Sequence, residues 1–417
     1  MEWLKVRAVT VLRWSERYTK TDMVYLASGG IWLLLGQAVA LGLSLLLAVA
    51  FGHLASQDLY GNYKYALSLA GVLGVFSLSG MSTAITHAIA HGRDGALRQG
   101  FLLNLRWSLG ISILGIILAL YYFYVGNAFA ALTLVIIALL TPFLNSFALY
   151  DAFLVGKKEF GTQTRYNLVS GALTTAAIVG ALFFTSRAIV IVLLYFSITL
   201  ALSAYWYLRT KQHTTNTETD PELFKYSAHL SIMNVVGGIA DKIDSIIIFN
   251  FIGPTQLAVY AYAIAMPEQI KAVVKSIIPL SMPKFAQRDF STIRATIWPR
   301  VLGLTFGLAM VILVYVLAAP LIFHLLFPVY VNSIFFSQVY ALSIIVTGFT
   351  AAFTAVLQAH KKTRELYVAS TVGAIALIVS LPILASLYGI LGAILSQVIY
   401  RVVSALCATW QFMRARD

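Results

Sequence analysis

Long apolar runs recur from one end of the chain to the other. A helix needs about 20 predominantly apolar residues to cross about 30 Å of hydrocarbon. Such segments are found at residues 24–51, 66–90, 107–124, 127–148, 167–186, 188–208, 227–252, 257–281, 301–327, 333–358, 366–387 and 389–412. The pattern predicts an all-α polytopic membrane protein of about twelve transmembrane helices.

The apolar runs also argue against a β-barrel, the other architecture that crosses membranes. Barrel strands alternate apolar and polar residues, whereas a run such as Leu134–Leu140 has no polar residue at all. Composition points the same way, because 60% of the residues are hydrophobic and 11% are charged. Soluble domains average about 45–50% and about 25%, so the excess apolar surface must face lipid.

Lysine and arginine gather on one side of the predicted bundle. The segments 1–23, 91–106, 149–166, 209–226, 282–300, 359–365 and 413–417 hold most of the 29 basic residues, whereas the opposite connections hold two. The positive-inside rule therefore predicts cytoplasmic termini. The net charge of +13 is then a signal of topology and of contact with anionic lipid rather than of nucleic-acid binding.

A polar stretch, Thr210–Glu222, divides the twelve spans into six and six. We expect a basic cytoplasmic segment at 1–23 and a short cytoplasmic tail at 413–417. Between them lie an N-lobe at 24–208, a cytoplasmic linker at 209–226 and a C-lobe at 227–412.

Short matches suggest that the two halves repeat one another. Tyr63 and Tyr65 follow the first span as Tyr260 and Tyr262 follow the seventh, at a constant offset. Because each half has six spans, both halves enter the membrane from the same side. The lobes should be related by a pseudo-two-fold axis along the membrane normal, with a site between them near mid-membrane.

Charged residues lie within several predicted spans of the second half, whereas the predicted spans of the first half contain none. A charge at the bilayer centre costs about 2.5–3.5 kcal/mol on insertion scales, so such groups are rare without a function or a partner. The charged positions are Asp241, Lys242, Asp244, Glu268, Lys271, Lys275 and Arg401.

Two interpretations of these charges remain open. In one, they are buried ion pairs that join neighbouring helices; in the other, they line a hydrated cavity. On the second interpretation, Lys271, Lys275 and Arg401, together with Glu268, form a substrate-binding site for an anionic group. Asp241 and Asp244, at i,i+3 on one helix face, should repel each other and couple transport to a proton or a sodium ion.

No motif of a known enzyme class is recognisable. There is no phosphate-binding loop, zinc-protease helix or dinucleotide fingerprint, and one cysteine, Cys407, allows neither a disulfide nor a cysteine metal site. We therefore expect a transporter rather than an enzyme, with no catalytic residues, no metal and no cofactor.

Several short motifs resemble the polysaccharide transporter (oligosaccharide flippase) family of the multidrug/oligosaccharidyl-lipid/polysaccharide exporter superfamily. They include Thr21–Trp32, Leu59-Tyr60-Gly61-x-Tyr63, Phe76–Met81, Lys242-Ile-Asp244 with Gly253 and Tyr260, and Tyr388-Gly389-x-x-Gly392-Ala393. The resemblance covers essentially the whole chain. Some flippases of this superfamily have fourteen spans, whereas this chain has twelve.

The resemblance implies a flippase that moves lipid-pyrophosphate-linked oligosaccharide across the bacterial cytoplasmic membrane by alternating access, for cell-surface polysaccharide biosynthesis. Implied partners are this substrate, the phospholipid bilayer, a coupling proton or sodium ion and other polysaccharide-assembly membrane proteins. One alternative is a proton- or sodium-coupled exporter of small cationic molecules, and a second is a membrane-embedded glycan polymerase or ligase. The cations of the second half favour an anionic substrate over a cationic one.

Overall fold

The computed structural model describes residues 23–286, 290–360 and 362–415, and these residues contain helices and no strand. Most of the basic N-terminal segment, 1–22, and the last two residues lie outside the described part. The helices are α2 Met23–Leu54, α3 Gln57–Val75, α4 Met81–Ala90, α5 Ala96–Tyr124, α6 Ala128–Phe147, α7 Tyr150–Gly156, α8 Phe160–Phe184, α9 Ala188–Lys211, α10 Leu223–Ala240, α11 Ile243–Phe251, α12 Pro254–Ala286, α13 Phe290–Thr296, α14 Trp298–Leu326, η1 Pro328–Tyr330, α15 Ser333–Ala359 and α16 Thr363–Arg414.

The described helices correspond to the twelve predicted spans. Eight of them are long and apolar enough to cross a membrane. One of these, α16, turns at Gly389 and so contains two spans; the φ of 60° at this residue lies in the left-handed region that favours glycine. The three remaining spans are α3 with α4, α10 with α11, and α12. The expectation of an all-α multi-pass membrane protein is therefore confirmed.

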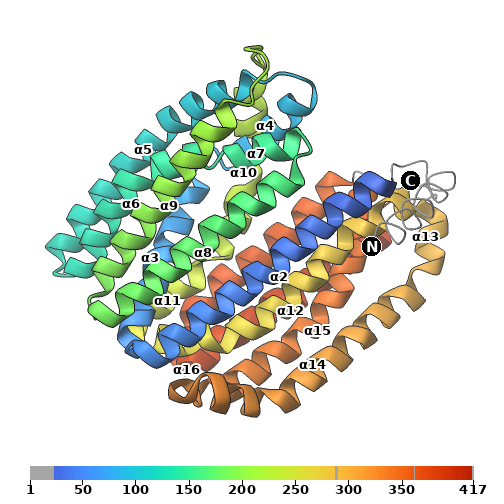
Figure 1. Ribbon diagram of the computed structural model, residues 1–417. Coiled ribbons are helices and arrows are strands. Elements are labelled where there is room, and N and C mark those ends of the chain that lie inside the picture. Colours follow the sequence, from blue (N-terminus) through green and yellow to red (C-terminus); the bar gives the residue numbers. More distant parts are fainter. Residues whose placement is uncertain (1–22, 287–289, 361, 416–417) are drawn as a thin grey trace, which may run out of the picture.

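The helices form two groups that meet along α3 and α12 (Figure 1). In the N-lobe, α5, α6 and α9 pack together and α2 packs on α8, while in the C-lobe α15 contacts α12, α14 and α16. At the contact between lobes, a Cβ on Gly61 would lie 1.9 Å from the Pro254 carbonyl oxygen. Only glycine allows the second spans of the two halves to approach so closely.

The helix boundaries of two spans differ from those that were expected. The second span starts at Gln57 rather than 66, so Lys64 belongs to α3 and not to a connection; the prediction that the first-half spans carry no charge is wrong here. The seventh span stops after Ala240 and restarts at Ile243. Asp241 and Asp244 therefore do not share the face of one continuous helix.

The polar linker packs against the N-lobe. The backbone N–H and the hydroxyl of Thr215 each donate to Asp94 at 2.8 Å, and the Lys157 Nζ lies 2.7 Å from the same carboxylate. Arg93 also pairs with Asp220 at 2.9 Å. The linker is thus attached to the N-lobe at two acidic side chains.

We expect Asp94→Asn to loosen the linker. Burial raises the pKa of Asp94, but the Lys157 ammonium and the Thr215 donors outweigh burial and hold that pKa below its usual value. A lowered folded-state pKa stabilises docking at neutral pH, and this stabilisation is lost as the pH falls through the folded-state pKa. At neutral pH, losing one charge-assisted contact should speed linker proteolysis about tenfold, whereas Glu218→Gln should not. Equal cleavage rates would argue against docking through Asp94.

Candidate functional site

Two cavities meet at the charged residues of the second half. A central cavity of about 1060 Å³ lies between the lobes and is lined by α2, α3, α8, the break in the seventh span and α12. A second cavity of about 520 Å³ lies within the C-lobe, among α11, α12, α15 and α16. Both are lined by the same five residues, Asp241, Lys242, Asp244, Ile264 and Glu268. These residues form the wall between the cavities.

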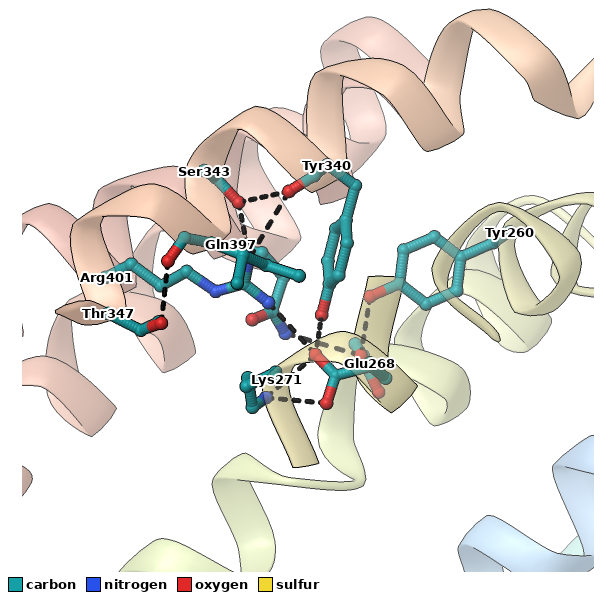
Figure 2. Close-up of polar contacts among 10 residues, drawn as sticks. Tyr260, Glu268, Lys271, Tyr340, Ser343, Thr347, Gln397 and Arg401 are labelled. Atoms are coloured by element: carbon teal, nitrogen blue, oxygen red, sulfur yellow. Dashed lines mark hydrogen bonds and ion pairs between the residues drawn. The ribbon is translucent and has the colours of Figure 1, made fainter. Parts of the chain in front are cut away.

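Glu268 of α12 is the centre of an ion-pair cluster in this wall (Figure 2). Its Oε2 lies 2.6 Å from the Lys271 Nζ, and its Oε1 lies 3.0 Å from the Arg401 Nη2 of α16. The Tyr340 hydroxyl of α15 donates to the same Oε1. One carboxylate therefore joins three helices of the C-lobe.

Arg401 is held on several sides in addition to Glu268. Its Nη1 donates to the Tyr340 carbonyl oxygen at 3.3 Å and to the Ser343 hydroxyl, and its guanidinium carbon lies 4.2 Å from the Tyr340 ring centroid. Only 4% of Arg401 is exposed. Burial of this kind is tolerated because the charge is both paired and hydrogen-bonded.

Asp244 sits in a different environment, with neutral partners. The Tyr260 hydroxyl donates to its Oδ2 at 2.6 Å, the Gln397 amide donates to the same oxygen at 3.3 Å, and the Ser245 backbone N–H donates to Oδ1 at 2.6 Å. Among the described side chains, no lysine or arginine pairs with this carboxylate within 4 Å. A buried carboxylate with neutral donors is suited to accept a proton or a small cation.

The structure thus brings together Glu268, Lys271 and Arg401, and it places Asp244 in the same wall with other partners. Asp241 is exposed at the end of α10 and lines both cavities. The side chain of Lys275 lies outside the described part. Features of both interpretations of the charges are present, because the cluster is an ion-pair network and also lines cavities.

Two cations that the sequence analysis did not assign to the site face the central cavity. They are Lys64 of α3, whose Nζ lies 5.2 Å from the Tyr60 ring centroid, and Lys242, whose stem packs against Gly71. Neither takes part in an ion pair among the described side chains. The sequence feature that could have placed Lys64 in a helix is Ser56, a residue type that favours the N-cap position. Its hydroxyl accepts from the backbone N–H of Leu59, so the helix begins at Gln57, before Lys64.

The lobes close on each other at the end of the bundle where α2 ends and α12 begins. The rings of Tyr262 and Tyr330 stack with their centroids 3.7 Å apart, and the Tyr60 ring centroid lies 4.7 Å from that of Tyr262. Thr255 of α12 donates to Asp58 of α3. The contacts of Tyr60 with Tyr262 and of Thr255 with Asp58 join the two lobes beyond the central cavity, at the end opposite the described chain ends.

Comparisons with known proteins identify a family for this chain and solved structures that share its fold. A family model described as polysaccharide biosynthesis protein matches residues 26–288. No curated protein matches the chain. The solved structures that resemble it include an inward-facing multidrug resistance MATE family transporter of the MOP superfamily, at a TM-score of 0.62 and 15% identity, covering 91% of this chain and 94% of that chain.

Two further structures share the fold. The lipid II flippase MurJ, in an inward closed conformation, gives a TM-score of 0.59 at 14% identity, covering 93% of this chain and 89% of that one. The MATE multidrug transporter DinF-BH gives a TM-score of 0.64 at 16% identity, covering 94% of this chain and 96% of that one. At these identities the likeness shows a common fold.

Proposed function

Because this chain belongs to the polysaccharide biosynthesis protein family, we propose that it is a flippase for lipid-pyrophosphate-linked oligosaccharide. It would move this substrate across a bacterial cytoplasmic membrane by alternating access between an N-lobe, 24–208, and a C-lobe, 227–412. The observation that carries the proposal is the central cavity between the lobes, with Lys64 and Lys242 on its wall. A diphosphate needs fixed cations to replace the water that it loses on entry.

The charge balance of the two cavities supports an anionic ligand. Four cations, Lys64, Lys242, Lys271 and Arg401, line the cavities together with three carboxylates. Within the cluster, Glu268 neutralises one of its two cations, so the cluster keeps one positive charge. We assign direct diphosphate contact to Lys64 and Lys242. Lys271 and Arg401 remain part of the proposed site, as the positive C-lobe wall that Glu268 organises. Lys275 remains part of the proposed site on the sequence alone.

The carboxylates of the wall are the proposed ion-coupling groups. Asp244 has neutral donors and Asp241 is exposed to both cavities, so each can gain a proton or a sodium ion without losing a described ion pair. Adding a positive charge here makes the cavity more attractive to a diphosphate. Binding of the cation and binding of the substrate would then be coupled.

The function is tested in cells that lack this chain. A flippase defect should remove surface glycan and leave lipid-linked oligosaccharide in the inner leaflet, while efflux of a cationic dye stays unchanged. Normal surface glycan together with impaired dye efflux would favour the cation-exporter alternative.

The proposed orientation makes the linker and both termini cytoplasmic. In a Cys407→Ser background, Glu218→Cys in the linker should be labelled by an impermeant maleimide only after the cells are opened. Val329→Cys, which is 51% exposed at the opposite end, should be labelled in intact cells. The reverse pattern would overturn the orientation, and with it the cytoplasmic loading of substrate.

A further inference from the structure

The two walls of the central cavity differ in chemistry. The C-lobe side contributes Asp241, Lys242, Asp244 and Glu268, whereas the described N-lobe residues that line it include one charged side chain, Lys64. The other polar groups on the N-lobe side are amides and hydroxyls: Gln37, Ser44, Tyr60, Tyr63, Ser68, Gln163, Thr164, Asn167, Thr175 and Tyr195. The C-lobe wall thus offers several charged groups, whereas the N-lobe wall, apart from Lys64, offers neutral hydrogen-bonding groups.

A carboxylate outside the cavity lining holds two of these amides in place. Asp151 of α7 accepts from the Gln163 Nε2, which lies 3.0 Å from each of its oxygens. It also accepts from the Asn167 Nδ2 at 2.9 Å. The Tyr150 hydroxyl donates to the Asn167 Oδ1 at 3.1 Å. The amides of Gln163 and Asn167 are therefore oriented by neighbours behind them.

The orientation of the amides follows from the chemistry of Asp151. An ionised carboxylate can only accept hydrogen bonds, so both amides must turn their NH₂ groups toward it. The Gln163 Oε1 is then left without a protein partner. Asn167 is exposed and lines the cavity, and its second amide hydrogen is available there. One unpaired acceptor, which is buried in this structure, and one exposed donor stand four residues apart on the same face of α8.

We infer that Asp151, Gln163 and Asn167 form a carbohydrate subsite on the N-lobe wall, with Asp151 as the positioning residue. This inference rests on the proposed function and extends it to the sugar part of the substrate. A sugar hydroxyl both donates and accepts, so a neutral, fixed donor and acceptor match it, whereas a fixed cation matches phosphate. The sugar would lie against the N-lobe while the diphosphate contacts Lys64 and Lys242.

The position of the subsite along the bundle agrees with separate binding places for the sugar and the diphosphate. Gln163 and Asn167 are in the first turns of α8, about 5 and 10 Å from its start at 1.5 Å per residue. That start lies at the end of the bundle where the described chain begins and ends. Sugars extending from a diphosphate held deeper in the cavity would point toward this end.

The test compares ligands of equal charge that differ in the group on the terminal phosphate. A sugar there removes one negative charge, so the sugar-free ligand is farnesyl pyrophosphate with a methyl cap on the same phosphate. Purified protein is titrated with this methyl-capped ligand and with farnesyl pyrophosphate linked to glucose, galactose or N-acetylglucosamine. The wild type should bind at least one sugar-linked ligand more tightly than the methyl-capped ligand. Asp151→Asn and Asn167→Leu should each weaken the sugar-linked ligand about 3–10-fold, as expected for lost hydrogen bonds. Their affinity for the methyl-capped ligand should stay unchanged, which also shows that they are folded.

A matched control is Asn250→Leu, which removes an amide that lines neither cavity and should change neither affinity. If the wild type shows no preference for any sugar, or if both ligands weaken equally in the variants, the subsite is wrong and the diphosphate site stands. If the wild type binds neither ligand, the proposed function fails and the subsite fails with it.

Discussion

Glu268→Gln should strongly reduce both the stability of the protein and its transport activity. Glu268 is the carboxylate that Arg401 and Lys271 share, at 3.0 Å and 2.6 Å. Replacing it leaves the Arg401 guanidinium buried beside a neutral group. Removing one partner of a buried ion pair typically costs about 3–5 kcal/mol, because the remaining charge is uncompensated. The measurements are the thermal unfolding midpoint in detergent and glycan export at matched membrane levels.

Removing both charges separates stability from function. In Glu268→Gln with Arg401→Gln both charges of the Glu268–Arg401 pair are gone, so the guanidinium is not left buried without its partner and much of the lost stability should return. Transport should stay low, because the C-lobe wall has lost the Arg401 guanidinium and the carboxylate that holds Lys271 in place, although its net charge is unchanged. Lys271→Ala is the milder comparison, since the Lys271 side chain is 22% exposed and can be hydrated. If Glu268→Gln is as stable as the parent, the cluster does not hold the three helices together.

Lys64→Ala combined with Lys242→Ala should abolish transport without unfolding the protein. A hydrogen bond to a charged group contributes about 1.5–3 kcal/mol, so each loss should weaken binding of a diphosphate roughly 10- to 100-fold. Stability should change little, because neither lysine forms an ion pair among the described side chains. Substrate affinity and glycan export are the quantities to measure.

Charge and position can be separated at these two lysines. Arginine at both positions should keep part of the activity, and glutamate should be worse than alanine, because it repels the diphosphate. Lys225→Ala, an exposed lysine of α10 outside both cavities, is the matched control and should transport normally. Export at the parental rate by the double alanine variant would remove both lysines from the proposed site.

The spans were predictable because membrane thickness imposes a length that apolar runs must meet. The motif resemblance is confirmed at the level of the family by the match over residues 26–288. The contact between Glu268 and Lys271 was also predictable, since their i,i+3 spacing places them on one helix face. These features depend on residues that are close together in the chain.

The breaks and the long-range pairs were not predictable in the same way. An apolar run does not reveal where its helix stops, so residues 227–252 were predicted as one unbroken span despite the break at Asp241 and Lys242. Lys64 was missed because hydropathy starts the span at the first strongly apolar residue, whereas the N-cap Ser56 starts the helix earlier. The pairing of Arg401 with Glu268 joins helices 133 residues apart, and no spacing rule reaches that far.

The proposed function is the movement of lipid-pyrophosphate-linked oligosaccharide between leaflets. Its most direct test uses vesicles carrying a fluorescent form of that lipid in both leaflets and a glycosidase added outside, which reaches the outer leaflet alone. With the wild-type protein, the protected inner pool should become cleavable, and with Lys64→Ala plus Lys242→Ala it should stay protected. If wild-type vesicles keep the inner pool as well protected as protein-free vesicles do, the chain is not a flippase for this substrate.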